Sequence, residues 1–79
     1  MSNMKREVVF DSEKRILAAL IEVRKSVGMT QKDLSEKTGI AQPDISKIER
    51  GMGNPSIKTL IRIAEGLGMD LHIEFVPHQ

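Results

Sequence analysis

Apolar residues recur at helical spacing in the segment that precedes the first glycine of the chain. They stand three or four positions apart, so they share one face of a helix. Asp11 or Ser12 can cap the start, and Gly28 suits the left-handed conformation that commonly ends a helix. The pattern therefore predicts a long amphipathic helix over Asp11–Val27. Its apolar face consists of Ile16, Leu17, Leu20, Ile21, Val23 and Val27.

Two short helical segments follow, separated by a glycine. Thr30 can cap the first of them, Thr30–Thr38, and Asp33 three positions later makes a near capping box. Gly39 interrupts the pattern and takes a positive φ without the steric cost of a Cβ atom. The next segment, Ala41–Arg50, has its proline in the first turn, where a helix tolerates it. We therefore expect two short helices joined by a tight turn.

The last third of the chain predicts one more helix and then a strand. Helical spacing extends over Ser56–Leu67, although Gly66 lowers helix propensity by about 1 kcal/mol relative to alanine and is expected to weaken the last turn. Leu71, Ile73 and Phe75 then alternate with His72, Glu74 and Val76, which predicts a strand over Asp70–Val76 that Pro77 ends. The predicted fold class is mainly α, with four helices and a C-terminal β-strand. The strand's apolar face consists of Leu71, Ile73 and Phe75.

A lone strand cannot satisfy its own backbone hydrogen-bonding groups, so it needs a partner. One candidate is the N-terminal segment Glu7–Phe10, and the other is the same strand of a second subunit across a two-fold axis. We favour the second, and both arrangements are compatible. A chain of 79 residues without cysteine buries only about 60% of its surface. A homodimer would add the stabilisation that such a small core lacks.

Charge and composition exclude several classes of protein. The net charge is only +1, but seven basic residues outnumber four acidic ones between Arg24 and Lys58. We find no signal peptide and no apolar run long enough to span a membrane, so we expect a cytoplasmic, nucleoid-associated protein. His72 and His78 have no third ligand beside them, so no metal or cofactor is expected. No catalytic constellation is present, and the sequence predicts no enzyme.

The two short helices have the residues that a helix-turn-helix requires over residues 30–50. Ser35 is small where the first helix leans on the second, and Gly39 reverses the chain. Apolar residues on the inner faces hold the angle between the helices, which leaves the outer face of the second helix free. The inner residues are Leu34, Ile40, Ile45 and Ile48. The outer residues are Gln42, Pro43, Ser46, Lys47 and Arg50.

This region resembles the Cro/phage-repressor-type (XRE) helix-turn-helix family. The resemblance covers roughly residues 13–68 and is strongest over the run MTQKDLSEKTGIAQPDISKIERG and the later NPSIKTLIRIAEGLG. It implies a phage-repressor-like DNA-binding domain over 11–68, preceded by an N-terminal arm (1–10) and followed by a dimerisation strand and tail (69–79). Asp44 departs from what a DNA-facing position favours; it can stabilise the helix start or accept a hydrogen bond from cytosine. Ala41 replaces the serine that often caps the third helix.

The resemblance also assigns roles to individual residues. Gln31 matches a glutamine that contacts phosphate and braces the recognition helix, and Arg24 and Glu49 match a buried ion pair. The positions that imply base contacts are Gln42, Pro43, Ser46 and Lys47. The positions that imply phosphate contacts are Gln31, Lys32, Arg50, Asn54 and Lys58, with backbone near Gly53 contributing.

The strand ending resembles DNA-binding antitoxins of the HigA and HipB kind. This resemblance implies a homodimer that binds a near-palindromic double-stranded operator and a cognate toxin, and represses the operon that encodes both. Residues 1–10 could contact such a toxin or form a disordered tail. Two alternatives stay open, namely a free-standing transcriptional regulator without a toxin, and a protein-interaction module that has lost DNA binding.

Overall fold

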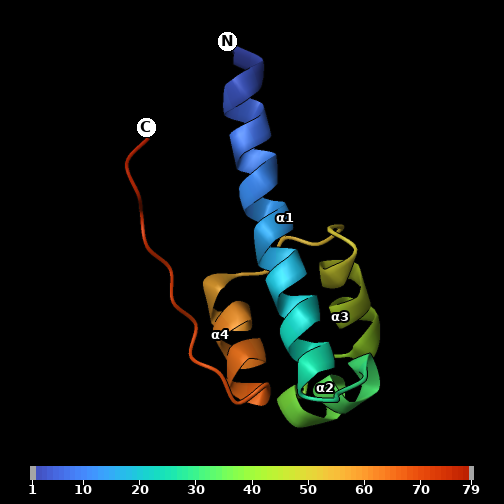
Figure 1. Cartoon of the computed structure of the whole chain (residues 1–79). Coiled ribbons are helices and arrows are strands. Elements are labelled where there is room, and N and C mark those ends of the chain that lie inside the picture. The colour runs from blue at the N-terminus through green and yellow to red at the C-terminus, as the bar shows by residue number, and fades with distance from the viewer. Residues whose placement is uncertain (1, 79) are drawn as a thin grey trace.

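The computed structural model describes the backbone of residues 2–78 and the side chains of residues 13–78. This part of the chain contains four helices: α1 (Ser2–Ser26), α2 (Gln31–Thr38), α3 (Gln42–Glu49) and α4 (Ile57–Gly66). Helix α2 packs against α3 and α4, and α1 packs against α3 (Figure 1). The mainly helical architecture agrees with the prediction.

Helix α1 begins at Ser2, well before the predicted start at Asp11. No glycine or proline occurs before Gly28, so nothing in the backbone chemistry interrupts the helix in that stretch. The side chains of residues 1–12 lie outside the described part of the chain. The predicted contact of the 1–10 arm with a toxin falls on these residues. The prediction that Asp11 or Ser12 caps the helix is wrong, because both residues lie inside α1.

The start and end of α2 follow the prediction from local sequence. The Thr30 hydroxyl accepts a hydrogen bond from the Asp33 backbone N–H at 3.0 Å, and the Asp33 carboxylate accepts one from the Thr30 N–H at 2.9 Å. This is a complete capping box, in which each residue satisfies a backbone group of the other. Gly39 ends the helix at φ 76°, and its N–H donates to the Ser35 carbonyl. The tight turn therefore requires the left-handed conformation that glycine adopts without strain.

The other two short helices differ in how they begin. Ala41 precedes α3 and provides no side-chain hydrogen bond, as its methyl group predicts, while Pro43 lies in the first turn. Ser56 precedes α4, and its hydroxyl accepts a hydrogen bond from the Thr59 N–H at 3.1 Å. Helix α4 therefore has a capped start, which α3 lacks.

The core lies where α2, α3 and α4 meet, beneath the C-terminal half of α1. Leu34 and Ile45 are fully buried, and Ile63 is 1% exposed. Full burial of one such side chain contributes about 1.5–3 kcal/mol relative to leaving it in water. Ile48 and Leu67 complete the buried cluster. Around it pack the partly buried side chains of Leu17, Leu20, Val23, Met29 and Ile40.

Gly66 lies at the closest approach of α4 to α2. A Cβ atom at this position would stand 2.5 Å from Thr38 Cγ2 and 3.3 Å from Leu34 Cδ1. The Thr38 side chain is held in place, because its hydroxyl donates to the Leu34 carbonyl and accepts from the Ile40 N–H. The glycine that sequence propensity marks as a weak point is therefore the residue that lets the two helices touch.

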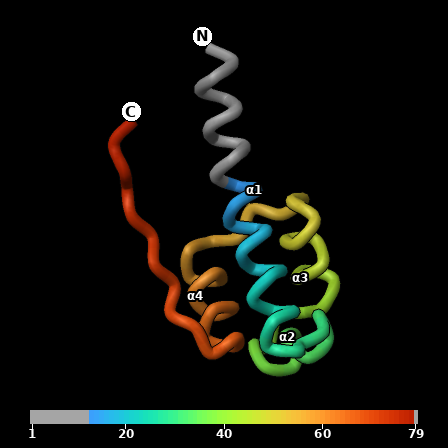
Figure 2. Tube along the Cα trace, viewed as in Figure 1, coloured from blue at the N-terminus to red at the C-terminus, as the bar shows by residue number. Residues whose placement is uncertain are grey.

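The predicted strand over Asp70–Val76 is not formed in the described part of the chain. After Met69 the C-terminal segment is extended and irregular as it runs past α4 (Figure 2). A strand takes its hydrogen bonds from a neighbouring strand, and a single chain offers none here. The alternative partner, residues 7–10, belongs to α1 and not to a strand. Consequently Ile73 is 57% exposed and Phe75 is fully exposed.

We predict that Gly66→Ala destabilises the protein although alanine favours helices. Overpacking a close contact costs about 1–3 kcal/mol, which outweighs the gain in helix propensity of about 1 kcal/mol. Urea unfolding should show a loss of about 1–2 kcal/mol in the free energy of unfolding.

The matched rescue variant is Gly66→Ala combined with Thr38→Ser. Serine lacks the Cγ2 methyl group but keeps the hydroxyl that bonds Leu34 and Ile40. The double variant should recover most of the lost stability. A single Gly66→Ala variant that is more stable than the parent chain would contradict this account of the α2–α4 contact.

Candidate nucleic-acid interface

The turn between α2 and α3 is held by two side chains of α2. The Ser35 hydroxyl donates to the Ile40 carbonyl at 2.6 Å, and the Thr38 hydroxyl accepts from the Ile40 N–H at 3.2 Å. Both backbone groups of Ile40 are thus bonded across the turn. The sequence predicted a small residue at Ser35 for steric reasons, and the hydrogen bond adds a second reason. Two short helices are therefore fixed at one angle.

Helix α3 buries one face and exposes the opposite one. Ile45 and Ile48 point into the core and are 0% and 7% exposed. Four of the residues on the outer side are exposed, and Ser46 is half-buried. The outer face therefore presents the predicted base-contacting positions together to the solvent. These positions are Gln42, Pro43, Ser46 and Lys47, with Arg50 at the end of the helix.

The residues predicted to contact phosphate are in two different environments. Lys32, Asn54 and Lys58 are exposed, on α2, the α3–α4 loop and α4. Gln31 is half-buried, and its side-chain amide donates to Glu49 Oε1 at 3.0 Å. The bracing role expected of Gln31 is therefore visible, since Glu49 is the last residue of α3.

The ion pair between Arg24 and Glu49 joins α1 to the end of α3. Arg24 Nε donates to Glu49 Oε2 at 2.7 Å, and Nη2 donates to Oε1 at 3.0 Å. The remaining terminal nitrogen, Nη1, donates to the Met29 carbonyl at 2.9 Å. The side chains are only 10% and 5% exposed. A two-point contact of this kind fixes direction as well as distance.

The carboxyl of Glu49 titrates under opposing influences. Burial raises its pKa, but hydrogen bonds from Arg24 and Gln31 and the nearby positive charge outweigh this effect, so the pKa lies below its ordinary value of 4.5. Asp33 also has a lowered pKa, because its carboxylate accepts the hydrogen bond from the Thr30 backbone. Both carboxylates are therefore charged at neutral pH, and each contributes stability in that form.

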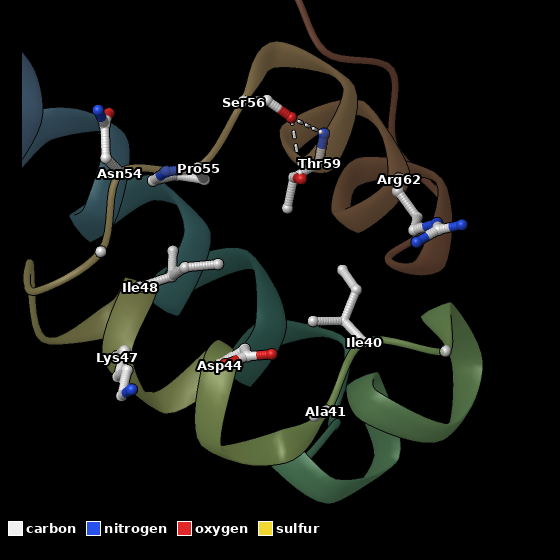
Figure 3. Close-up of a pocket in the computed structure, with 12 residues that line it drawn as sticks. Ile40, Ala41, Asp44, Lys47, Ile48, Asn54, Pro55, Ser56, Thr59 and Arg62 are labelled. Atoms are coloured by element: carbon white, nitrogen blue, oxygen red, sulfur yellow. Dashed lines mark hydrogen bonds between the residues drawn. The ribbon is translucent and has the colours of Figure 1, made fainter.

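A groove lies between α3 and the start of α4. It has a volume of about 620 Å³ and is lined by the turn, one side of α3, the α3–α4 loop and α4 (Figure 3). Asp44 and Lys47 form its α3 wall, with Thr59 and Arg62 on the α4 side. Arg62 was not among the predicted site residues. Its position one turn beyond Lys58 was the available signal, because residues four apart share a helix face.

The described residues give no support for metal chemistry or for a membrane span. No group of three or more potential metal ligands comes together among residues 13–78. His72 instead lies 3.3 Å from the carboxylate of Glu74, on the exposed C-terminal segment. No helix in the part searched is both long enough and apolar enough to cross a membrane.

This geometry defines a helix-turn-helix, and comparison with known proteins agrees. The chain belongs to the helix-turn-helix family, whose model matches residues 20–73. A transcriptional regulator of this type from Haemophilus influenzae is 38% identical over 58 residues, which are 73% of this chain and 59% of that protein. The regulator y4dJ of Sinorhizobium fredii is 33% identical over 66 residues, 84% of either chain. The family to which the chain belongs thus includes proteins named as transcriptional regulators, and the chain spans 59% of the length of the first of them.

Two further similarities concern toxin–antitoxin systems. The antitoxin HigA1 of Mycobacterium tuberculosis is 30% identical over 63 residues, which are 80% of this chain but 42% of that protein. A solved structure named as a toxin–antitoxin module from Streptococcus pneumoniae superimposes with a TM-score of 0.70 at 30% identity. The match covers 91% of this chain and 80% of the other.

We predict that the Arg24–Glu49 pair makes stability depend on pH in a defined direction. Because the folded pKa of Glu49 is lowered, its contribution is complete above its ordinary value of 4.5 and is lost as pH falls through the folded value. Glu49→Gln should cost a few kcal/mol at pH 7, toward the low end of the roughly 3–5 kcal/mol typical of breaking a buried pair. The difference from the parent chain should shrink below pH 4.5.

Urea unfolding at a series of pH values measures this effect. The exposed variant Glu36→Gln is the matched control and should unfold like the parent chain at each pH. Both variants keep Asp33, so its own acid dependence cancels from the comparison. A constant gap between Glu49→Gln and the parent chain from pH 7 to pH 3 would contradict the assignment.

Proposed function

We propose that this protein is a sequence-specific transcriptional repressor that inserts α3 into the major groove of operator DNA. The observation that carries the proposal is the outer face of α3, where Gln42, Pro43 and Lys47 are exposed while Ile45 and Ile48 of the same helix are buried. An α-helix fits the major groove, where each base pair presents a distinct pattern of donors and acceptors. The exposed side chains supply groups that read such a pattern.

Each side chain on this face has a definite capability. The Gln42 amide can bond adenine N6 and N7 together, which discriminates by about 1–3 kcal/mol against other bases. Pro43 offers an apolar contact to a thymine methyl group, and Lys47 is a donor to guanine or to phosphate. Ser46 is half-buried and reaches less far. Specificity is therefore expected to rest chiefly on Gln42 and Lys47.

Contacts with phosphate would hold the protein in register. Lys32, Arg50, Asn54 and Lys58 are all exposed, and they lie on three different elements around α3. Such contacts carry no sequence information, but they release counterions and make binding depend on salt. Arg62 in the adjacent groove extends the positive edge.

The proposed repressor is a homodimer joined through its C-terminal segment. Leu71, Ile73 and Phe75 are 39%, 57% and 100% exposed, which leaves a continuous apolar stripe without cover. Pairing of two such segments would satisfy their backbone groups and bury the stripe. A two-fold axis would place two α3 helices about 34–36 Å apart, so the operator is expected to be a near-palindrome.

The biological role that the similarities favour is that of an antitoxin that represses its own operon. The HigA1 antitoxin and the pneumococcal toxin–antitoxin module both match most of this chain. A free-standing regulator is the second candidate, favoured by the relatives named only as transcriptional regulators. Expression of the adjacent reading frame alone and together with this protein separates the two. Growth arrest that this protein relieves indicates an antitoxin.

We predict that Gln42→Ala weakens specific DNA binding while leaving the fold intact. A preferred site is first selected from random double-stranded DNA with the parent protein, and its Kd is then measured for both proteins. Loss of one bidentate contact worth about 1–3 kcal/mol corresponds to roughly a 5- to 150-fold higher Kd. Binding to unrelated DNA should change little, because that binding depends on phosphate contacts.

The matched control is Glu36→Ala, an exposed change on α2 away from the α3 face. The parent protein should also lose affinity with salt, with a log–log slope of about −0.9 for each phosphate contacted. Equal affinity of Gln42→Ala and the parent protein for the selected site would remove Gln42 from the interface. A failure to select any site, with no salt-dependent binding, would favour the protein-interaction module.

We predict that a chain truncated after Met69 is monomeric. The buried core lies within residues 24–67, so the helical domain should keep its circular dichroism spectrum. Sedimentation measures the mass of both forms, and a chain truncated after Val76 is the control that should remain dimeric. A dimer that persists without residues 70–79 would place the interface elsewhere.

A further inference from the structure

The C-terminal segment alternates so that its two sides differ in chemistry. Residues 71, 73 and 75 are apolar, whereas 70, 72 and 74 are charged or titratable. His72 and Glu74 lie 3.3 Å apart, so these two side chains occupy the same side of the segment. Leu71 lies on the other side of the alternation and lines a groove with α1 and α4. Leu71, the first residue of the apolar side, therefore faces α1 and α4.

This groove is an apolar surface that the single chain leaves open. It has a volume of about 180 Å³ and lies between α1 and α4, where Ile16 and Leu20 face Leu60 and Ile63. Ile16 remains 48% exposed. The segment borders the groove only with Met69, Asp70 and Leu71, and the residues that follow do not line it. Further apolar side chains are needed to close it.

The alternation also limits how two copies of the segment can pair. In an antiparallel pair, residues directly opposite each other point to the same face of the ribbon. Any two-fold axis that falls between residues would set apolar side chains opposite polar ones. A two-fold axis that passes through a residue sets odd-numbered residues opposite odd-numbered ones, so Leu71, Ile73 and Phe75 stay on one face of the ribbon. Only the registers with such an axis therefore need to be compared.

Charge decides among the axes that pass through residues. An axis at His72 sets Asp70 opposite the partner's Glu74, and an axis at Glu74 sets two glutamates against each other. Like charges directly opposite destabilise a pair. An axis at Leu71 sets Phe75 opposite the partner's Leu67, which is buried at the end of α4. An axis at Phe75 sets Ile73 opposite the partner's Pro77, which has no N–H to donate.

We propose that two copies of residues 70–76 pair as antiparallel strands about a two-fold axis through Ile73. In this register His72 lies opposite the partner's Glu74 twice, and Leu71 lies opposite the partner's Phe75 twice. At the two ends of the ribbon Asp70 lies opposite the partner's Val76, which is the one pair that is not matched in polarity but sets no like charges together. Phe75 of each chain then covers the groove that the partner's Leu71 lines. The occupant of the α1–α4 groove is thus a second copy of this chain. The inference rests on the homodimer of the proposed function and specifies its register.

Single cysteines test the register, because the parent chain contains none. Directly opposite residues have Cα atoms about 4.5–5.5 Å apart, which a disulfide can bridge. Ile73→Cys should therefore crosslink with its own copy. His72→Cys and Glu74→Cys stand two residues from their own copies, at roughly 8 Å, which is beyond the reach of a disulfide. Neither should crosslink alone, whereas an equal mixture of the two should.

Crosslinking is measured on non-reducing gels after mild oxidation. The protein concentration is one at which the parent chain sediments as a dimer. Crosslinking of His72→Cys alone as fast as Ile73→Cys would overturn the register and leave the dimer standing. No crosslinking by any variant, with the parent chain still dimeric, would place the interface elsewhere. A monomeric parent chain would overturn both the register and the proposed homodimer, and the salt-dependent DNA assay would still test the repressor function separately.

A charge exchange provides a second readout without cysteine. Glu74→Lys sets a lysine opposite the partner's His72 and should raise the dimer Kd several-fold in sedimentation. Adding His72→Glu sets a glutamate opposite the partner's lysine and should return the Kd toward that of the parent chain. A double variant no better than Glu74→Lys would contradict the proposed pairing. Glu36→Lys, the same change of charge at an exposed position of α2 outside the segment, is the control and should leave the dimer Kd unchanged.

Discussion

The carboxylate of Glu49 is the point on which the orientation of α3 depends. It stands at the end of α3 and accepts hydrogen bonds from Arg24 of α1 and Gln31 of α2. Three helices are thus tied at one nearly buried group, and the guanidinium of Arg24 also holds the Met29 carbonyl before α2 begins. The network costs desolvation, which only good geometry offsets. It is consistent with a surface that must present side chains at one fixed angle.

The opposite end of the helix-turn-helix is set by small residues in close contact. Gly39 turns the chain in the left-handed conformation, and Gly66 admits the side of Thr38 against α4. Ser35 and Thr38 satisfy the backbone of Ile40 between them. These contacts leave little freedom for α2 and α3 to change their angle. Rigidity of this kind lowers the entropy that a reading helix would lose on entering DNA.

Two exposed surfaces of the molecule differ in polarity, and each suits a different kind of partner. The outer face of α3 is polar and positively charged at Lys47 and Arg50, as a surface that reads DNA requires. The C-terminal segment is apolar on one side and exposed at Ile73 and Phe75. Exposing an apolar stripe of this kind to water is unfavourable, and contact with a second copy of the chain would bury it. The proposed dimer would turn one reading helix into two at a fixed spacing.

What the sequence determined by itself was local. The bounds of α2 and α3 followed closely from Thr30, Gly39 and Pro43, because capping, left-handed turns and proline act within a few residues of the chain. Those of α4 followed from the helical spacing of its apolar residues. The outward face of α3 followed from the periodicity of its apolar residues. A family resemblance predicted the partnership of Arg24 with Glu49, which local rules could not have supplied.

Only the tertiary structure decided the features that depend on residues far apart in the chain. Gly66 was expected to be a weak point, and contact with Thr38 made it a packing requirement. The resemblance implied that Gln31 braces α3, but only the structure identifies Glu49, eighteen positions away, as the acceptor of its side-chain hydrogen bond. The strand over Asp70–Val76 was predicted from alternation, yet no strand forms there in a single chain. The physical reason is common to all three: a side chain or a strand takes its role from its neighbour in space, and sequence periodicity does not name that neighbour.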